Sequence, residues 1–263
     1  MTQTVLETSA PSRSGLFTVA ALQKAVAFVV LIALVAYFGV AAPNFLTPDN
    51  MVGILQATAV NGVLGVASTL VIITGGIDLS VGTLMTFSAV ICGVTLNNAL
   101  MPPMIVGVIA ALAVGALCGA ISGVIIAKMR VPPFIATLGM MLLLKGLALV
   151  IAQDKPIYFN DTPNFSVISN DSLIGVFLPD FQVPNGVLIL FLVAILGSIV
   201  LNKTLLGRYI FALGSNEEAA RLSGVNVDFW KIVTYALGGL ICGIAGLIIA
   251  SRLNSAQPAL GQG

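Results

Sequence analysis

The sequence predicts an all-α fold, a polytopic bundle of transmembrane helices, and three observations support this prediction. Of the 263 residues, 58% are hydrophobic and only 8% are charged, whereas about a quarter of the residues are charged in soluble domains. The apolar residues gather into long runs of about the 20 residues that a helix needs to cross a bilayer. These runs are continuously apolar rather than alternating, which argues against the strands of a membrane barrel.

The composition also argues against several classes of function. A net charge of +1 provides no basic field for nucleic acid. The chain has no His, so the commonest proton shuttle and metal ligand is missing. Cys92, Cys118 and Cys242 lie far apart within apolar runs, and we expect packing residues rather than metal ligands there. No nucleophile and base occur in a catalytic pattern, so we expect neither an enzyme nor a metal site.

The chain divides into a short tail and one membrane domain. Residues 1–18 are polar and rich in Ser and Thr, which predicts a disordered cytoplasmic tail before a transmembrane domain at 19–263. A signal peptide after Lys24 is disfavoured because further full-length spans follow. Seven runs, separated by Pro and Gly breakers, are long enough to span: 21–41, 51–74, 81–100, 104–127, 134–152, 185–202 and 232–251.

The distribution of Lys and Arg predicts that the N-terminus is cytoplasmic, because positive residues concentrate on that side. Only Lys155 and Arg252 then fall outside, and Lys145 lies within a span. The polar segment 153–184 becomes external, and 203–231 becomes the largest cytoplasmic loop. The basic residues that fall inside are Arg13, Lys24, Lys128, Arg130, Lys203, Arg208, Arg221 and Lys231.

A stripe of small residues predicts how the helices pack. Association of membrane helices depends on close approach of backbones, which small side chains allow. Such residues recur every fourth position in the fourth run, and a second stripe begins in the seventh. The stripes are Gly107, Ala111, Gly115, Gly119 and Gly123 in one run, and Gly239 and Gly243 in the other.

The junction "ITGGIDLSVG" at residues 73–82 places a carboxylate between two apolar runs. Gly75 and Gly76 permit backbone angles that other residues avoid, so we expect them to end the second span. Asp78 and Ser80 suit the N-cap of the third span, where their side chains can satisfy helix amides. This structural interpretation requires no ligand.

The cytoplasmic loop contains the stretch "GSNEEAARLSGVNVDFWK" at residues 214–231. Ser215 followed by Glu218 forms a capping box, and Gly224 is placed to end the helix in a left-handed turn. The predicted helix has about two turns and is marginal alone, so it needs a surface to lie on. Its small residues Ala219 and Ala220 would let another protein approach closely, although an ordinary solvated connector is an equal alternative.

Four blocks occur in the order found in one known family: "ITGGIDLSVG", "VPPFIATLGMMLLLKGLALV", "LLGRYIFALGSN" and "GSNEEAARLSGVNV". Over about residues 40–263 the chain resembles the permeases of ribose-type sugar ABC importers. Members of that family continue beyond the final "NSAQPALGQG" with a glycine-rich segment and further helices. On this resemblance we expect the last part of the family pattern to be absent from the given sequence.

The resemblance implies a set of partners. A family permease lies in the bacterial cytoplasmic (inner) membrane, pairs with a second permease copy as a homodimer or heterodimer, and binds an external sugar-binding protein. A separate cytoplasmic subunit binds ATP, in keeping with the absence of a phosphate-binding Gly-x-x-x-x-Gly-Lys-[Ser/Thr] loop here; no cofactor is expected in this chain. By resemblance, contact with the ATPase falls to Glu217, Glu218, Ala219, Ala220, Arg221 and Gly224.

The resemblance also gives the junction at residues 73–82 a second interpretation, in which the helix breaks at membrane depth and lines a sugar path. Sugars are polyols, and intramembrane polar groups are candidates for function. Irregular backbone is tolerated there only where protein or a water-filled cavity covers it. Both interpretations can hold together. The candidate pathway residues are Gln56, Asn61, Gly75, Gly76, Asp78 and Ser80.

Two alternatives to the sugar importer stay open at this stage. An ion-coupled secondary transporter would need interrupted spans in matching positions of two halves, and only the junction at Gly75 and Gly76 is visible. A shortened, non-transporting membrane subunit is the second alternative. The sugar itself is not specified, because relatives with different sugars share these motifs.

Overall fold

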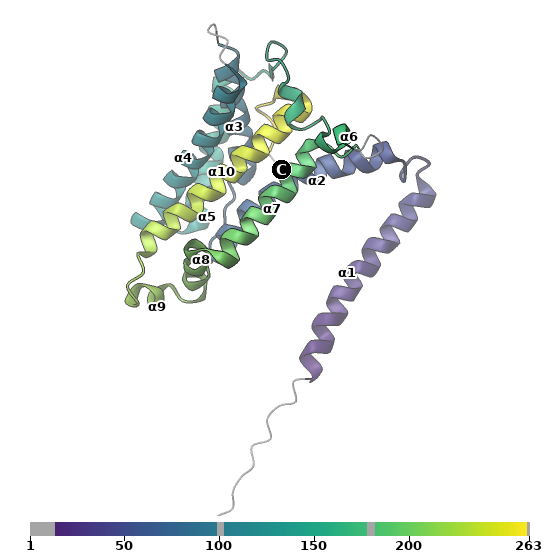
Figure 1. Ribbon diagram of the computed structural model, residues 1–263. Coiled ribbons are helices and arrows are strands. Elements are labelled where there is room, and N and C mark those ends of the chain that lie inside the picture. The colour runs from purple at the N-terminus through teal and green to yellow at the C-terminus, as the bar shows by residue number, and fades with distance from the viewer. Residues whose placement is uncertain (1–13, 99–102, 178–181, 262–263) are drawn as a thin grey trace, which may run out of the picture. The chain divides into compact units, whose positions relative to one another are not determined.

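The structure is a computed structural model that describes residues 14–98, 103–177 and 182–261 (Figure 1). Its long elements are all helices, as the sequence predicts. The chain forms two compact units, residues 1–51 and 52–263.

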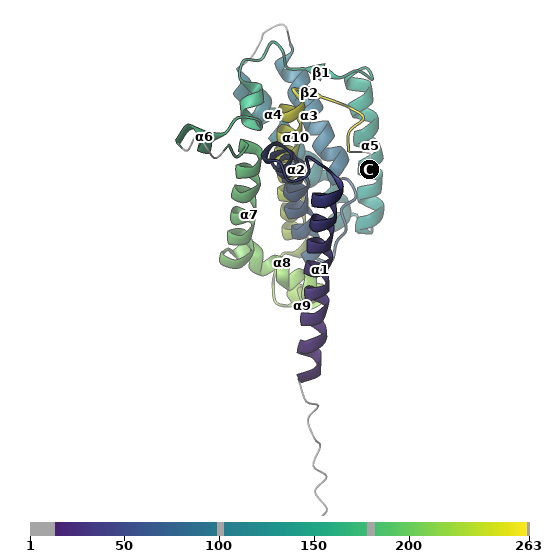
Figure 2. The ribbon, with the colours of Figure 1, turned by 90° about the vertical axis from the view of Figure 1, so that its right-hand side faces the viewer.

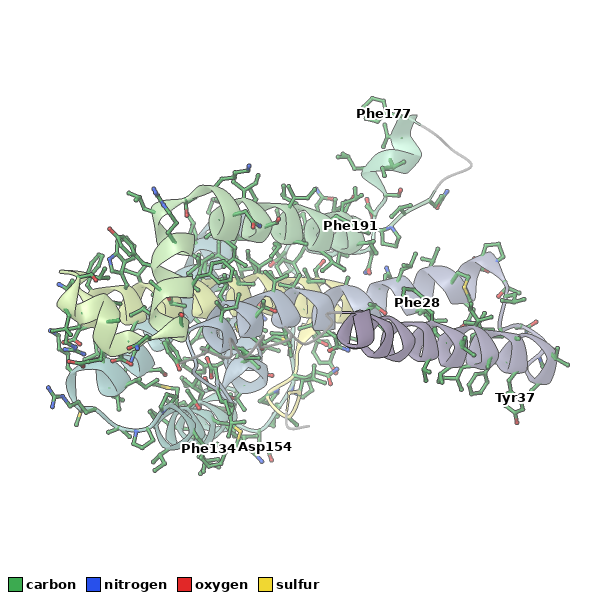
Figure 3. The ribbon with its side chains drawn as sticks, turned by 90° about the horizontal axis from the view of Figure 1, so that it is seen from below. Phe28, Tyr37, Phe134, Asp154, Phe177 and Phe191 are labelled. Carbon is green, nitrogen blue, oxygen red and sulfur yellow. The ribbon has the colours of Figure 1, made fainter. Side chains whose placement is uncertain are left out.

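The first unit contains helix α1 (Ser14–Ala41) and the turn that follows it. The turn is held by hydrogen bonds from Thr47 Oγ1 to the Asn44 carbonyl (2.8 Å) and from Asn50 Nδ2 to the Phe45 carbonyl (2.7 Å). Exposed apolar side chains such as Phe28 and Tyr37 cover α1 (Figure 3), as suits a lipid-facing helix. Of the tail expected at 1–18, residues 1–13 lie outside the described residues, and the rest is helical because α1 begins at Ser14.

The second unit holds most of the long helices. α2 (Pro48–Ile73) enters it from the first unit and is followed by α3 (Val81–Leu96), α4 (Met104–Lys128) and α5 (Pro133–Ile151). α7 (Asn185–Lys203) and α10 (Val227–Leu253) complete the set of long helices. The short elements are β1 (Ile157–Tyr158), η1 (Phe165–Ile168), α6 (Leu173–Phe177), α8 (Leu205–Ser215), α9 (Glu217–Leu222) and β2 (Ser255–Ala256).

Among the described residues, five helices are long and apolar enough to cross a membrane: α2, α4, α5, α7 and α10. The chain is therefore an all-α polytopic membrane protein, and the seven-span count stays a prediction. α3 is apolar but has only 16 residues. It ends at Leu96 rather than at residue 100: Asn97 is the C-cap, and its Nδ2 donates to the Tyr158 carbonyl at 2.7 Å.

Helix α10 packs against α4 through the predicted stripes of small residues. A methyl group added to Gly115 or to Gly239 would overlap the backbone carbonyl of the other residue, and one added to Gly119 would meet the Tyr235 carbonyl. The two backbones therefore touch without intervening side chains, as predicted. α10 also packs against α3, and Cys242 is fully buried in this core.

The segment at 153–184 is fastened to the far end of α10. β1 pairs antiparallel with β2, Ile157 opposite Ala256 (Figure 2). The Ser251 hydroxyl donates to the Phe165 carbonyl and accepts from the Ser169 amide, both at 2.9 Å. Residues 157–169 therefore form a structured cap on one end of the bundle.

The loop at 203–231 contains a helix that the sequence analysis missed. α8 begins after Thr204, whose hydroxyl accepts from the Gly207 amide at 3.3 Å. Ile210 and Leu213 are buried along one side of it, so α8 is an amphipathic helix that covers the end of the bundle. The sequence analysis assigned these eleven residues to a connecting loop, because the run is too short, and contains too many polar residues, to span a membrane.

We expect Gly115→Ala to lower the stability of the bundle, because the new methyl group overlaps the Gly239 carbonyl. Overpacking of this kind costs roughly 1–3 kcal/mol. Thermal unfolding in detergent measures the effect. The matched control is Gly139→Ala in α5, where an added Cβ meets nothing within 4 Å and helix propensity improves by up to about 1 kcal/mol. Equal stability of the two variants would contradict close α4–α10 packing.

Candidate functional site

The first candidate site is the non-helical segment 74–80, which joins α2 to α3. Gly75 has a φ of 80°, a left-handed conformation that favours glycine. Gly76 is buried, and a Cβ there would lie 2.5 Å from the Tyr235 hydroxyl. Thr137 of α5 holds the segment from the other side, since its hydroxyl accepts from the Leu79 amide at 3.2 Å. The break in the helix is therefore built into the packing of three helices.

Asp78 does not cap α3 in the way that the sequence predicts. Its Oδ1 accepts from the Ser80 amide at 2.8 Å and from the Ser80 hydroxyl at 2.6 Å. Ser80 occupies the N-cap position but its side chain caps no helix amide, because the hydroxyl is turned to Asp78. The Asp78 carboxylate thus fixes Ser80, the residue that precedes α3. The two residues form a tight local turn of the kind that Asp favours.

A cavity of about 590 Å³ lies beside this break, within the range of about 300–1,000 Å³ that is typical of small-molecule pockets. Its walls come from α2, from the start of α3, from Met141 of α5, from the end of α10 and from residues 260–261. Asn61 and Arg252 are the polar side chains among its lining residues. A mostly apolar cavity with two polar groups can hold and orient a small solute.

The structure brings only some of the predicted pathway residues to this cavity. Asn61 lines the cavity. Leu79 and Gly82, which precede and follow Ser80 in the sequence, line it as well. Gly75, Gly76, Asp78 and Ser80 shape the neighbouring break and do not line the cavity. Gln56 lies apart from it and donates to Asn170 Oδ1 at 3.4 Å.

Two residues that the sequence analysis did not select belong to this region. Arg252, in the last turn of α10, was counted only as an external charge, and it lines the cavity. The buried Tyr235 hydroxyl has no hydrogen-bond partner in the described part of the chain and faces Gly76. No sequence pattern pointed to Tyr235, because its surroundings depend on the fold.

The second candidate site is α9, and its N-terminus differs from the prediction. The cap is Asn216, whose Oδ1 accepts from the Ala219 amide at 2.9 Å. Ser215 is the last residue of α8, so its backbone is helical and cannot take the N-cap conformation. The prediction of a capping box formed by Ser215 and Glu218 is therefore wrong, because the N-cap lies one residue later in the chain.

The C-terminus of α9 is as predicted. Gly224 has a φ of 85°, its amide bonds to the Arg221 carbonyl at 3.0 Å, and the Val225 amide bonds to the Ala220 carbonyl at 3.1 Å. These two bonds form the Schellman motif, which stops a helix where a residue turns left-handed.

The two alanines of α9 have different roles. Ala220 is buried against Leu213 and Val227, which corrects the expectation that both alanines face a partner. Ala219 points outward and lines a groove of about 410 Å³ between α8 and α9. Leu222, which the sequence analysis did not select, is 82% exposed.

Ion pairs connect α9 to the bundle. Glu217 lies 2.6 Å from Lys231 Nζ of α10 and 3.4 Å from Arg221. Asp228 lies 3.8 Å from Arg221 and 3.3 Å from Lys128 of α4. Glu217 and Arg221 of α9 are thus paired with α10, whose Asp228 also pairs with Lys128 of α4.

Comparison with known proteins identifies the family. Residues 50–263 match the family model described as "Branched-chain amino acid transport system / permease component". The chain belongs to this permease family. It is 44% identical over 251 residues to the ribose import permease protein RbsC of Escherichia coli K12, covering 94% of this chain and 75% of that protein. This result confirms the resemblance carried by the four sequence blocks.

Other relatives are also import permeases. The fructose import permease protein FrcC of Rhizobium meliloti is 41% identical over 89% of this chain and 65% of its own length. The Bacillus subtilis ribose import permease protein RbsC is 36% identical over 92% of this chain and 72% of its own length. No solved structure matches the chain.

We expect Asp78→Ala to destabilise the protein because it removes both hydrogen bonds to Ser80. A hydrogen bond contributes about 0.5–1.5 kcal/mol to stability. Asp78→Asn is the matched control, since its Oδ1 still accepts both bonds and should preserve most of the stability. Thermal unfolding in detergent tests this. An Ala variant as stable as the parent would show that these bonds do not hold the break.

Proposed function

We propose that the chain is the membrane permease subunit of an ABC importer that moves a monosaccharide into the cytoplasm. The observation that carries the proposal is the 44% identity to a ribose import permease over 94% of the chain. The relatives named for fructose, allose and arabinose support a sugar as substrate. The same relatives favour the ABC importer over an ion-coupled secondary transporter and over a non-transporting subunit.

In the proposed topology the chain crosses the inner membrane of a bacterial cell seven times. Its N-terminus lies in the cytoplasm. Lys128, Lys203 and Arg221 support it, because these basic residues lie in or beside the elements at the end of the bundle that carries α8 and α9 (Figure 1). Positive residues favour the cytoplasmic side. The segment 153–184 would then face outward, toward the sugar-binding protein.

The cavity beside residues 74–80 is the proposed part of the sugar pathway. Asn61 can donate and accept hydrogen bonds, and Arg252 supplies donors, so both match the hydroxyl groups of a sugar. The interrupted backbone at Gly75, Gly76, Asp78 and Ser80 gives the pathway a fixed shape at the point where α2 and α3 meet. Irregular backbone inside a bilayer is expected where it borders such a cavity.

The proposed contact with the ATPase is the outward surface of α9, formed by Ala219 and Leu222. The Asn216 cap and the Gly224 turn fix this helix at both ends. Its ion pairs with Lys231 and Asp228 would pass movement of the ATPase to α4 and α10. A second permease copy and an external binding protein complete the proposed assembly. The chain itself binds no ATP in this scheme.

One observation favours a second substrate class. The matching family model is described by branched-chain amino acid transport, and the walls of the cavity are mostly apolar. Leucine or a similar amino acid is therefore the second candidate. It is the weaker one, since the similar relatives are named for sugars.

Uptake by the complete transporter tests the substrate. The ATPase and binding protein that co-purify with the permease from its native membrane are expressed together with it in cells without sugar uptake. We expect saturable uptake of a labelled monosaccharide, insensitive to excess leucine and lost on ATP depletion. Leucine uptake in place of sugar uptake would reject the substrate. Uptake that survives ATP depletion but stops with a proton ionophore would reject the ABC mechanism.

Variants of the same transporter test the cavity. Asn61→Leu removes a polar group from the lining and should reduce sugar uptake by about fivefold or more, the effect of one lost hydrogen bond of about 1 kcal/mol. Gln56→Leu is the matched control, an amide on the same helix outside the cavity. Equal uptake by both variants would place the pathway elsewhere.

We expect Leu222→Asp to weaken capture of the ATPase at least about tenfold, because it places a charge in a contact that must lose water. The fold should be unaffected, since this side chain is exposed. Leu205→Asp is the matched control, an exposed leucine at the start of α8. Pull-down in detergent, with size exclusion as the folding check, measures both. Wild-type capture by Leu222→Asp would make α9 a plain connector.

A further inference from the structure

A second pocket, of about 310 Å³, lies on the charged side of α9. Its walls come from the turn between α4 and α5, from α9 and from the start of α10. Pro132 and Pro133 form part of the rigid wall, and three cations line it: Arg130, Arg221 and Lys231. Neither the sugar pathway nor the outward surface of α9 uses this pocket.

The pocket has an excess of positive charge. Glu217 is the one carboxylate among its lining residues, and Lys231 lies 2.6 Å from it. Arg221 shares Glu217 and Asp228 with other cations, at 3.4 and 3.8 Å. Arg130 has no ion pair with any described residue. With Lys128 and Asp228 included, four cations surround two carboxylates, so about two positive charges remain unbalanced.

The surroundings of the pocket are apolar and aromatic. Met129 is 68% exposed and Phe134 is 51% exposed (Figure 3), and these residues flank the turn that supplies Arg130. Exposed apolar side chains therefore lie directly beside the cations of the pocket.

We propose that this pocket binds a phosphate group, and that its source is the headgroup of an anionic phospholipid. Arg and Lys together bind phosphate through charge-assisted hydrogen bonds. Basic pockets between transmembrane helices on the cytoplasmic side are suited to anionic headgroups. The exposed apolar side chains beside the turn provide the surface for the acyl chains, which a free phosphate would not need.

A bound headgroup would join three elements at once. Arg130 belongs to the α4–α5 turn, Arg221 to α9 and Lys231 to α10. The phosphate would supply the negative charge that the pocket lacks and would hold α9 against the bundle. The lipid is thus inferred to strengthen the placement of the proposed ATPase-contacting helix. The inference rests on the proposed function in one respect, namely that the pocket lies on the cytoplasmic side of the membrane.

The test uses the purified permease alone in a neutral detergent, so that neither transport nor ATPase contact affects the result. Thermal unfolding is followed against the concentration of three probes: short-chain phosphatidylglycerol, a diacylglycerol with the same chains, and soluble glycerol phosphate. A ligand that binds the folded state raises the unfolding temperature in a concentration-dependent way. The apparent Kd is compared between the parent, Arg130→Gln, Arg221→Gln and the control Lys203→Gln, a basic residue that does not line the pocket.

We expect phosphatidylglycerol to stabilise the protein and diacylglycerol to have no comparable effect. Arg130→Gln should weaken phosphatidylglycerol binding about fivefold, the effect of one basic residue near an anionic headgroup, and Lys203→Gln should leave it unchanged. Binding of glycerol phosphate with the same dependence on Arg130 would keep the phosphate site but assign it a soluble source. Equal effects of Arg130→Gln and Lys203→Gln, or equal binding of diacylglycerol, would overturn the proposal. Loss of sugar uptake in the transport assay would leave this result untouched.

Discussion

The contact between α4 and α10 is the constraint on which the rest of the second unit depends. Gly115 and Gly239 meet backbone to backbone, so no side chain larger than hydrogen fits at the crossing. This approach places Tyr235 against Gly76 and brings Asp228 within 3.3 Å of Lys128. Through these residues α10 also contacts the break between α2 and α3 and the ion pairs of α9. In a lipid environment such close packing replaces the hydrophobic driving force that a soluble core would use.

Much of this architecture could be predicted from the sequence, because its signals are local or periodic. The apolar runs predicted the long helices, and the spacing of Gly115, Gly119 and Gly123 predicted a close helix contact, although not that its partner is α10. Helix α8 was missed because eleven amphipathic residues do not resemble a span. The fixed structure of residues 157–169 was not predicted, since it depends on pairing of Ile157 with Ala256, which lie far apart in the chain.

The candidate sites were predictable to a smaller extent. Gly224 was correctly assigned because a left-handed glycine after a short helix has a strong local signal. The cap at Asn216 was displaced by one residue, since Ser215 and Asn216 are both good caps and only the length of α8 decides between them. Arg252 and Leu222 were not selected, because their selection depends on which side of a helix faces a cavity or water. Periodicity is too weak to decide this in α10, which is largely apolar, and in α9, which has only six residues.

The attachment of both ends of α10 has a mechanical consequence. One end holds β2 and the hydroxyl of Ser251, which fasten the segment at 153–184. The other end carries Lys231 and Asp228, which form ion pairs with residues of α9. A helix of 27 residues is a stiff rod about 40 Å long at 1.5 Å per residue. Because this rod is fastened at both ends, a displacement of the residues attached to one end would be carried along α10 to those attached to the other.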